Sequence, residues 1–236
     1  MTPCAYRHCD EMAGSHAAAR IIVPRILAVT GPVRSVVDVG GGDGGWLREF
    51  QAHGCEDVLL LDSPEVRAHL VVDPSAFKAV NMLHDDLPAR KSDLAICLEC
   101  AEHLPAGREK WLIDYLTSTA DVVVFSAAIP GQGGKGHVNE QPHFHWTELF
   151  RQRGFRCLDV LREQIVHDCS IPWWYRQNMF VYASEASHIN GTPFLPDDMC
   201  LIHRDVFTRL VKCGIRERLR LLLRDVARYV LPDQCT

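Results

Sequence analysis

The side chains best suited to acid–base chemistry lie in one glycine-rich stretch, residues 131–145 (GQGGKGHVNEQPHFH). His137 stands near its centre, and an imidazole titrates near neutral pH, so it can accept a proton from a substrate. Asn139 and Glu140 follow closely and could orient the ring. We therefore predict that His137 is the general base of an enzyme, with a purely structural role as the alternative.

A second stretch, residues 36–46 (VVDVGGGDGGW), has the composition of a ligand-binding turn. An apolar run ends in an acid and a cluster of glycines, which predicts a strand, a tight turn and a helix. Gly40, Gly42 and Gly44 can take positive φ, and the helix points unpaired N–H groups into the turn. A nucleotide-like cofactor fits this turn. The glycines satisfy both G-x-G-x-x-G and G-x-G-x-G, so they do not identify the cofactor.

Alternating apolar runs and helical patterns predict the framework that positions these two stretches. The alternation indicates a parallel sheet with helices on both faces. Ligands of such sheets bind at the carboxyl ends of the strands, and the long loop 127–144 is expected there too. The predicted strands are 35–39, 58–61, 77–82, 93–98, 121–126, 156–161 and 178–183; the predicted helices are 10–30 (with Pro24 inside), 43–53, 105–119 and 146–153.

The composition bounds the class of protein. A chain of 236 residues, 47% hydrophobic and 23% charged, fits one globular α/β domain with an appendage. The net charge of −5 argues against general nucleic-acid binding. We find no apolar run near the roughly 20 residues of a membrane span and no signal-peptide core, so we expect the cytoplasm. The scattered Cys97, Cys100 and Cys157 are expected to be small buried hydrophobic residues.

Features outside the glycines distinguish between the two cofactor templates. Asp38 lies two residues before the first glycine, where a carboxylate can meet a cationic amino group. The chain has no Tyr-x-x-x-Lys pair of the kind that many dehydrogenases use, and LECAEHLP at 98–105 is not a dehydrogenase feature.

Taken together, residues 15–183 resemble the class I S-adenosylmethionine-dependent methyltransferases. The last two of the matching segments are similar to a bacterial subgroup that modifies small molecules or sugars. The segments are VVDVGGGDGG (36–45), LLLD (59–62), FKAVNM (77–82), DLAICLECAEHLP (93–105), VVVFSAAIPGQGGKGHVNEQ (122–141) and WWYRQNMFVYA (173–183).

The resemblance implies a Rossmann-like seven-stranded mixed sheet with an antiparallel last strand. It also implies S-adenosylmethionine as cofactor and S-adenosylhomocysteine as product. Gly40 and Gly42 would line the methionine part of the cofactor, with Asp38 near its ammonium group. Asp62 would accept hydrogen bonds from both ribose hydroxyls, with the capping of the following turn as its alternative role. Glu99 is expected at the cofactor as well.

The adenine contact departs from the family pattern. The family has an Asp before an apolar residue beside the adenine amine, and Asn81-Met82 stands at that place here. Asn81 keeps an acceptor oxygen but lacks the charge, so Asp85 and Asp86 are alternatives.

The resemblance also places catalysis in the loops after the fourth and fifth strands. Glu102 and His103 follow the fourth strand and are expected to close the pocket or take part in catalysis. The other residues expected to contact substrate are Asn139, Glu140, His143, Trp173, Trp174 and Tyr175, the three aromatic ones with core packing as their alternative role.

A metal-dependent alternative uses some of the same residues, although our leading prediction includes no metal. Glu99-x-x-Glu102-His103, with His143 or His145, is similar to the metal site of small-RNA 2′-O-methyltransferases. Two carboxylates and two imidazoles could hold a divalent ion that lowers the pKa of a hydroxyl.

The sequence thus predicts methyl transfer from S-adenosylmethionine to a small molecule, at a hydroxyl oxygen of a natural product or sugar. The alternatives are metal-dependent RNA 2′-O-methylation and a non-catalytic cofactor-binding scaffold. We expect a helical segment (1–30), the methyltransferase domain (31–184), and a connector with a C-terminal helical extension (185–236). The helix over 216–230 has an apolar stripe that would pack on the domain or form a homodimer.

Overall fold

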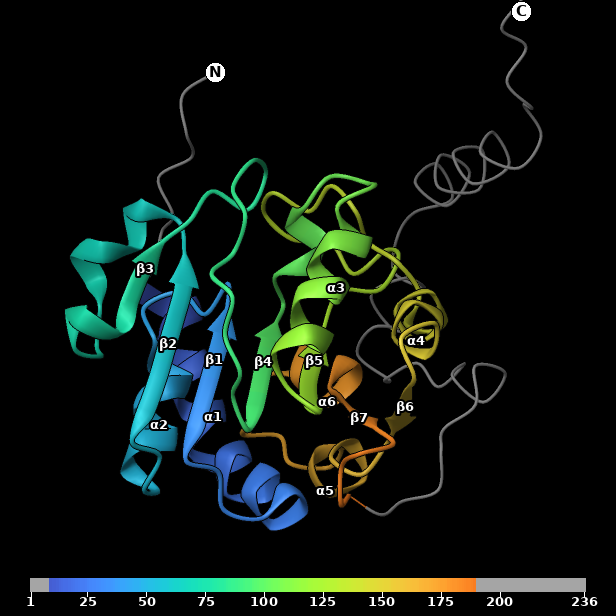
Figure 1. The fold of residues 1–236 in the computed structure, drawn as a ribbon, viewed down its shortest axis with the longest axis horizontal. Coiled ribbons are helices and arrows are strands. Elements are labelled where there is room, and N and C mark those ends of the chain that lie inside the picture. The colour runs from blue at the N-terminus through green and yellow to red at the C-terminus, as the bar shows by residue number, and fades with distance from the viewer. Residues whose placement is uncertain (1–8, 190–236) are drawn as a thin grey trace, which may run out of the picture. The chain divides into compact units, whose positions relative to one another are not determined.

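The computed structural model describes residues 9–189, and a seven-stranded mixed sheet lies at its centre (Figure 1). The strands are β1 (Ser35–Val39), β2 (Asp57–Asp62), β3 (Phe77–Ala79), β4 (Leu94–Leu98), β5 (Val122–Ser126), β6 (Phe155–Leu158) and β7 (Phe180–Ser184). Their order is β3-β2-β1-β4-β5-β7-β6. The first five strands are parallel, and β7 runs antiparallel to both β5 and β6. The predicted mixed sheet with an antiparallel last strand is confirmed.

Helices cover both faces of the sheet (Figure 1). One face carries α1 (Cys9–Thr30), α2 (Gly45–Ala52), α5 (Arg162–Ile165) and α6 (Trp173–Asn178), and the other carries α3 (Glu109–Thr119) and α4 (His143–Arg151). Three short 3-10 helices complete the connections: η1 (Pro64–His69), η2 (Pro74–Ala76) and η3 (Ala101–His103). None of the helices within residues 9–189 is both long and apolar enough to cross a membrane.

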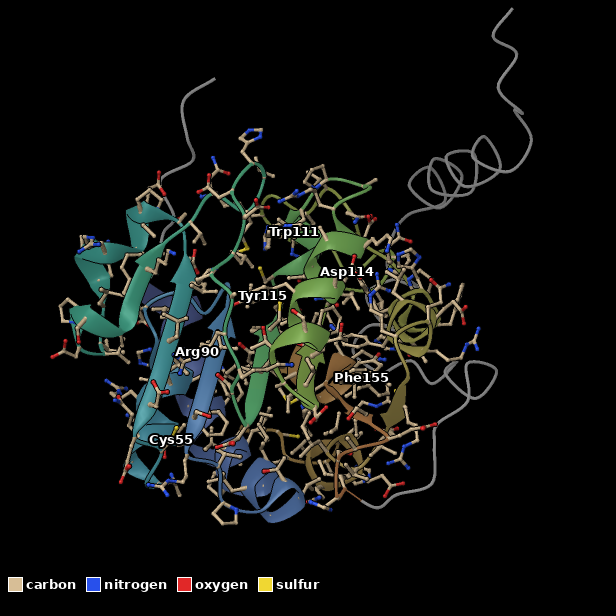
Figure 2. All side chains as sticks on the ribbon, viewed as in Figure 1. Cys55, Arg90, Trp111, Asp114, Tyr115 and Phe155 are labelled. Atoms are coloured by element: carbon tan, nitrogen blue, oxygen red, sulfur yellow. The ribbon has the colours of Figure 1, made fainter. Side chains whose placement is uncertain are left out.

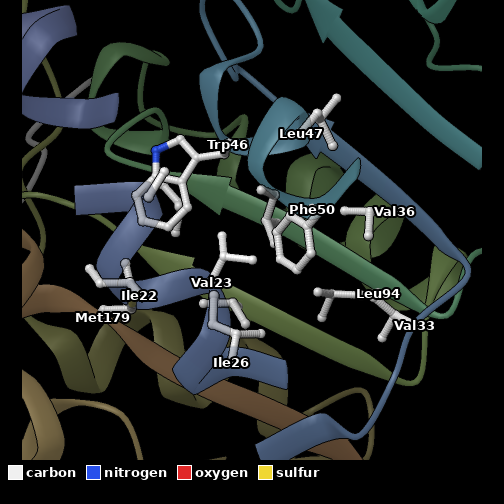
Figure 3. Packing of buried hydrophobic residues seen from close by; sticks show 14 of the residues in the cluster. Ile22, Val23, Ile26, Val33, Val36, Trp46, Leu47, Phe50, Leu94 and Met179 are labelled. Atoms are coloured by element: carbon white, nitrogen blue, oxygen red, sulfur yellow. The ribbon is translucent and has the colours of Figure 1, made fainter. Parts of the chain in front are cut away.

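Alternation along the strands produces two separate cores. Val36 of β1 faces α1 and α2, whereas Val37 faces the side of α3 and α4. Since successive strand residues point to opposite faces, each buried strand contributes apolar side chains to both cores. On the first face, Ile22 and Ile26 of α1 pack with Phe50 of α2 against the sheet (Figure 3). Cys97, Cys100 and Cys157 are all buried, as expected.

The helix α1 runs through Pro24 without being divided there, although the sequence favours a kink or break at that residue. Ile22, Val23 and Ile26 are fully buried on either side of the proline (Figure 3). Their packing offsets the loss of one helical hydrogen bond.

Several predicted boundaries shift for local reasons. The strand β3 ends at Ala79 instead of residue 82, because Asn81 accepts a bond from the Leu83 amide and starts a turn. The helix α4 begins at His143 instead of residue 146, so the last two histidines of the glycine-rich stretch are helical. The segment before β7 forms α6, a helix of 6 residues that the sequence analysis did not predict.

The connection from β3 to β4 is fixed at two points on the α3 side of the sheet (Figure 2). Arg90 forms an ion pair of 2.8 Å with Asp57 at the start of β2. The hydroxyl of Tyr115 in α3 donates to the carbonyl of Pro88 at 3.2 Å.

The predicted helix over 216–230 and its dimer contact lie outside the described residues. The domain boundaries stay a prediction.

Candidate active site

The glycine turn after β1 lies against the loop that follows β4. Gly40, Gly42 and Gly44 have φ values of 76°, 59° and 86°, in the region that favours glycine. A Cβ atom on Gly40 would lie 2.2 Å from the sulfur of Cys100, so a side chain cannot fit there. The turn and the residues after β4 therefore meet at van der Waals distance.

Two carboxylates flank this turn. Asp38 is 1% exposed, and its Oδ2 atom has no hydrogen-bond partner among the described residues. Burial, with the negative charges of Asp62 and Asp43, raises the pKa of Asp38 well above its usual range. A cationic ligand group beside Asp38 would remove this penalty, since a buried carboxylate is stable only when it is paired.

Asp62, at the end of β2, is bound to the turn itself. Its carboxylate accepts hydrogen bonds from the amides of Gly42 at 2.7 Å and Ser63 at 2.6 Å. Burial raises the pKa of Asp62, and these bonds partly oppose the shift. Each carboxylate oxygen keeps a second lone pair, so Asp62 can also accept from the hydroxyls of a ribose.

Of the residues predicted to contact adenine, Met82 lies near the glycine turn, whereas Asn81, Asp85 and Asp86 are exposed. Met82 lies near the turn, with its methyl group 3.6 Å from a Cβ placed on Gly40. Its carbonyl accepts from both Nε and Nη2 of Arg108, at 3.0 and 2.6 Å. The side chain of Asn81 is exposed and takes part in its own turn, and Asp85 accepts from the Asn81 amide at 2.7 Å. Asp86 is exposed on the same connection.

The helix α1 is attached to the glycine turn by a contact that the sequence did not indicate. His16 Nε2 lies 2.9 and 3.0 Å from the two carboxylate oxygens of Asp43, and the same carboxylate accepts from the Gly45 amide at 3.0 Å. Ser15 accepts from the indole of Trp46 at 3.0 Å. A helix well upstream in the sequence thus fixes the start of α2.

A buried polar network lies behind the loop after β4. Glu99 has a φ of 51°, and both of its carboxylate oxygens accept amide hydrogens, from Gln132 at 3.0 Å and from Asn178 at 3.1 Å. Asn178 also accepts from Nε2 of His143 at 3.1 Å. Burial lowers the pKa of His143 to about 4, with the nearby charge of Arg162 acting in the same direction. His143 is therefore a neutral hydrogen-bond donor.

His137 lies in the glycine-rich loop with one ring nitrogen fixed. Its Nδ1 atom is 3.0 Å from Glu140, and the same carboxylate accepts from the amides of Gly131 at 2.8 Å and Gly133 at 2.7 Å. Burial opposes ionisation of Glu140, but these bonds outweigh it and lower its pKa. The ionised carboxylate selects the tautomer with hydrogen on Nδ1, which leaves the lone pair on Nε2.

The Nε2 atom of His137 lies toward the loop after β4. Nε2 of His137 is 3.9 Å from Oε1 of Glu102, and the rings of His137 and His103 meet edge to face with centroids 5.0 Å apart. The amides of Val138 and Asn139 donate to the backbone carbonyl of Glu102 at 2.9 and 3.0 Å. Two segments that are far apart in sequence thus form one site.

Glu102 has an unusual environment. It is 0% exposed, and neither carboxylate oxygen accepts a hydrogen bond from the described residues. Burial raises the pKa of Glu102 well above its usual range, and the charges of Glu99 and Glu140 add to the effect, although the nearby amide groups of Glu102 and Ala128 act against it.

The remaining predicted substrate residues contact other side chains of the protein. Asn139 is 4% exposed and donates to Glu109 at 2.8 Å. Tyr175 is buried, and its hydroxyl lies 3.1 Å from Ser15. Trp174 packs on the α1 side of the core, and Trp173 meets its ring edge to face at 5.8 Å.

The comparisons with known proteins agree with this fold and turn. A family model described as a methyltransferase domain matches residues 13–125. These residues therefore have the sequence pattern of a methyltransferase domain, which agrees with the predicted methyltransferase family. This match favours the methyltransferase prediction over the dinucleotide-binding one.

Three solved structures illustrate the similarity, and at these identities they show the fold alone. DesVI from Streptomyces venezuelae is 14% identical, with a TM-score of 0.53 over 73% of this chain and 93% of that one. Magnesium protoporphyrin IX methyltransferase (ChlM) from Synechocystis PCC 6803, solved with bound SAH, is 16% identical, with a TM-score of 0.52 over 78% and 90%. An O-methyltransferase family protein from Burkholderia thailandensis is 13% identical, with a TM-score of 0.50 over 76% of this chain. Our chain spans 61% of the Burkholderia protein's length. No curated protein matches the sequence.

Proposed function

We propose that this protein transfers the methyl group of S-adenosylmethionine to a hydroxyl oxygen of a small molecule. The observation that carries this proposal is the group of Glu102, His103 and His137 next to the glycine turn. Cys100 touches the turn at Gly40, and Glu102 follows only two residues later. A hydroxyl held at this group would lie beside the cofactor that the turn binds.

The chemistry of methyl transfer explains why such a group is needed. A hydroxyl attacks the methyl carbon in line with the departing sulfur and must lose its proton. Positioning of the two reactants supplies about 7–11 kcal/mol of barrier reduction, and proton removal by a placed group contributes roughly 10²–10⁴-fold. With its Nδ1 hydrogen directed to Glu140, His137 presents the basic nitrogen for this task.

The cofactor roles follow from the same turn. We assign Asp38 to the ammonium of the methionine part, because it is a buried carboxylate without a partner for its Oδ2 atom among the described residues. Asp62 is assigned to the ribose hydroxyls, Gly40 and Gly42 to the methionine chain, and Met82 to the side of the adenine. We assign a supporting role around the acceptor pocket to four residues that already bind other side chains or the loop backbone: Glu99, Asn139, Glu140 and His143.

The experiment is an assay with methyl-labelled S-adenosylmethionine and a panel of hydroxylated small molecules, with a short RNA included for the ribose alternative. We expect an O-methylated small molecule together with S-adenosylhomocysteine. The variant His137→Ala should lose roughly 10²–10⁴-fold in turnover while still binding the cofactor. Cofactor binding without any product would instead favour the non-catalytic alternative, and unchanged turnover in His137→Ala would remove this histidine from the reaction.

A further inference from the structure

The role of His137 as a proton acceptor does not explain why Glu102 and His103 lie beside it. Each offers one ligand atom, and these three atoms lie within 4.8 Å of one another. A single general base needs one imidazole. Here two imidazoles and a carboxylate from two different loops converge, which is the arrangement of a metal-ion site.

The hydrogen bonds of the two histidines prepare them as ligands. Nδ1 of His137 is 3.0 Å from Glu140, and Nδ1 of His103 is 3.2 Å from the carbonyl oxygen of Gly136. Both partners only accept, so each Nδ1 carries the hydrogen and each lone pair lies on Nε2. Metal-binding histidines in proteins are commonly fixed in this way, by a carboxylate or a carbonyl on the other ring nitrogen.

Glu102 supplies the independent observation that a ligand belongs here. Its carboxylate is fully buried, both oxygens lack a hydrogen-bond partner among the described residues, and one of them lies 3.9 Å from Nε2 of His137. A buried carboxylate without a partner is costly, and a coordinated cation is one of the few groups that offset this cost. Glu99 differs, because both of its oxygens accept amide hydrogens.

We propose that Glu102, His103 and His137 bind one divalent transition-metal ion, such as Mn²⁺, Fe²⁺, Co²⁺ or Zn²⁺, which coordinates the hydroxyl oxygen of the acceptor. The two nitrogen ligands favour these ions over Mg²⁺ and Ca²⁺, which prefer oxygen. Ligand atoms about 2.1 Å from an ion lie about 3.0–3.5 Å apart, so closing the 3.9 Å separation takes about 0.5–1 Å of side-chain movement.

The role of the ion in binding an acceptor hydroxyl rests on the proposed function. The binding of the ion by the three side chains does not. With the ion bound, the hydroxyl of the acceptor coordinates to it and releases its proton to a water molecule. The oxygen then forms a bond to the methyl carbon of S-adenosylmethionine. The carbon–sulfur bond breaks, and its electron pair stays on sulfur as S-adenosylhomocysteine. His137 is then a ligand, and the ion replaces its role as a base.

The test is a titration of the full-length, metal-stripped protein with Co²⁺, followed by calorimetry and by the visible absorption of cobalt. We expect one ion per chain at this site and at least tenfold weaker binding in Glu102→Gln, His103→Ala and His137→Ala. The matched control is His53→Ala, because His53 is exposed and also faces a carboxylate, Glu49, at 3.5 Å but belongs to no group of three within the described residues. It should bind Co²⁺ as the unaltered protein does.

Binding of S-adenosylhomocysteine and circular dichroism establish that each variant is folded. The proposal is overturned if the unaltered protein binds no Co²⁺, or if the three site variants bind it as tightly as His53→Ala does; methyl transfer would stand in both cases. Co²⁺ bound at the site with no methylated hydroxyl from any acceptor would support the metal site and overturn the proposed function instead.

Discussion

Nε2 of His137 lies 3.9 Å from Oε1 of Glu102, a fully buried carboxylate that accepts no hydrogen bond from the described part of the chain. The two residues come from the loops after β5 and β4, and they meet because these strands are neighbours in the sheet. The glycine turn follows β1 on the other side of β4, so the proposed cofactor site and the proposed acceptor site lie on either side of the end of β4. Proteins often keep such unfavourable arrangements where function requires them.

The variant Glu102→Gln should separate function from stability. The amide is nearly the same size and cannot ionise, so we expect the free energy of unfolding of the metal-free variant at pH 7 to be higher than that of the unaltered protein, because the cost of burying an ionisable carboxyl is removed. Methyl transfer should fall at least tenfold. Urea unfolding of both proteins measures the first effect. A destabilised but fully active variant would show that Glu102 serves only the fold.

The variant Gly134→Ala should displace His137 without altering any site residue. A Cβ atom at Gly134 would lie 2.2 Å from Nε2 of His137, so the ring must move. We expect at least a tenfold loss in kcat with little change in KM for S-adenosylmethionine, measured by steady-state kinetics.

The matched control for this change is Gly14→Ala in α1, where the new Cβ would make an ordinary contact of 3.6 Å with Pro172. This control should keep full activity and gain about 0.5–1 kcal/mol in stability, because alanine favours a helix over glycine. Equal activity in Gly134→Ala and Gly14→Ala would contradict the placement of His137.

The variant His16→Ala should weaken cofactor binding from a distance. It removes the bond to Asp43, worth about 1–2 kcal/mol, and loosens the turn that Asp43 holds through the Gly45 amide. We expect the Kd for S-adenosylmethionine to rise about three- to tenfold in calorimetry, with kcat nearly unchanged. Arg20→Ala, an exposed site on the same helix, is the control and should bind normally. Similar Kd values for both variants would remove His16 from this role.

Stability should fall as the pH decreases from about 6.5 toward 4, in part because of His143. The pKa of His143 is about 4 in the folded protein and 6.5 for an imidazole exposed to water. Between these two pH values the unfolded chain therefore binds a proton at this residue that the folded protein does not bind. By linkage this stabilisation is complete above pH 6.5 and is lost as the pH falls; over the whole interval it amounts to about 3 kcal/mol.

The measurement is urea unfolding between pH 7 and pH 4 for the unaltered protein and for His143→Gln. Glutamine can still donate to Asn178 but does not titrate, so the pH dependence of the variant should be shallower. Parallel curves for the two proteins would assign the acid sensitivity to other groups.

The sequence predicts the framework well because its signals are local. Apolar runs such as 35–39 and 122–126 are bounded by glycine or polar residues, and the glycine turn needs positive φ at positions that the sequence fills with glycine. These features depend on the chain within a few residues. The mixed sheet with an antiparallel last strand then follows from the resemblance of the whole pattern to one fold.

The contacts that shape the site join residues far apart in the sequence, and no sequence pattern predicts them. Ser15 meets Tyr175 across 160 positions in sequence, and Glu99 meets Asn178 across 79. His143 and His137 look alike in the sequence, yet one is a buried donor in α4 and the other presents its lone pair to Glu102. The combination of Glu102, His103 and His137 could have been weighed from the Glu-His pair after the fourth strand. Their approach to one another becomes clear only in three dimensions.

The most direct test of the proposed reaction follows a ¹³C-labelled methyl group of S-adenosylmethionine. The protein is incubated with this cofactor, the proposed metal ion and a panel of hydroxylated small molecules. We predict a ¹³C-methyl ether on one class of acceptor, formed in equal amount with S-adenosylhomocysteine, and its loss in His137→Ala. Label found only on nitrogen, carbon or RNA, or label that stays on the cofactor across the whole panel, would contradict transfer to a small-molecule hydroxyl.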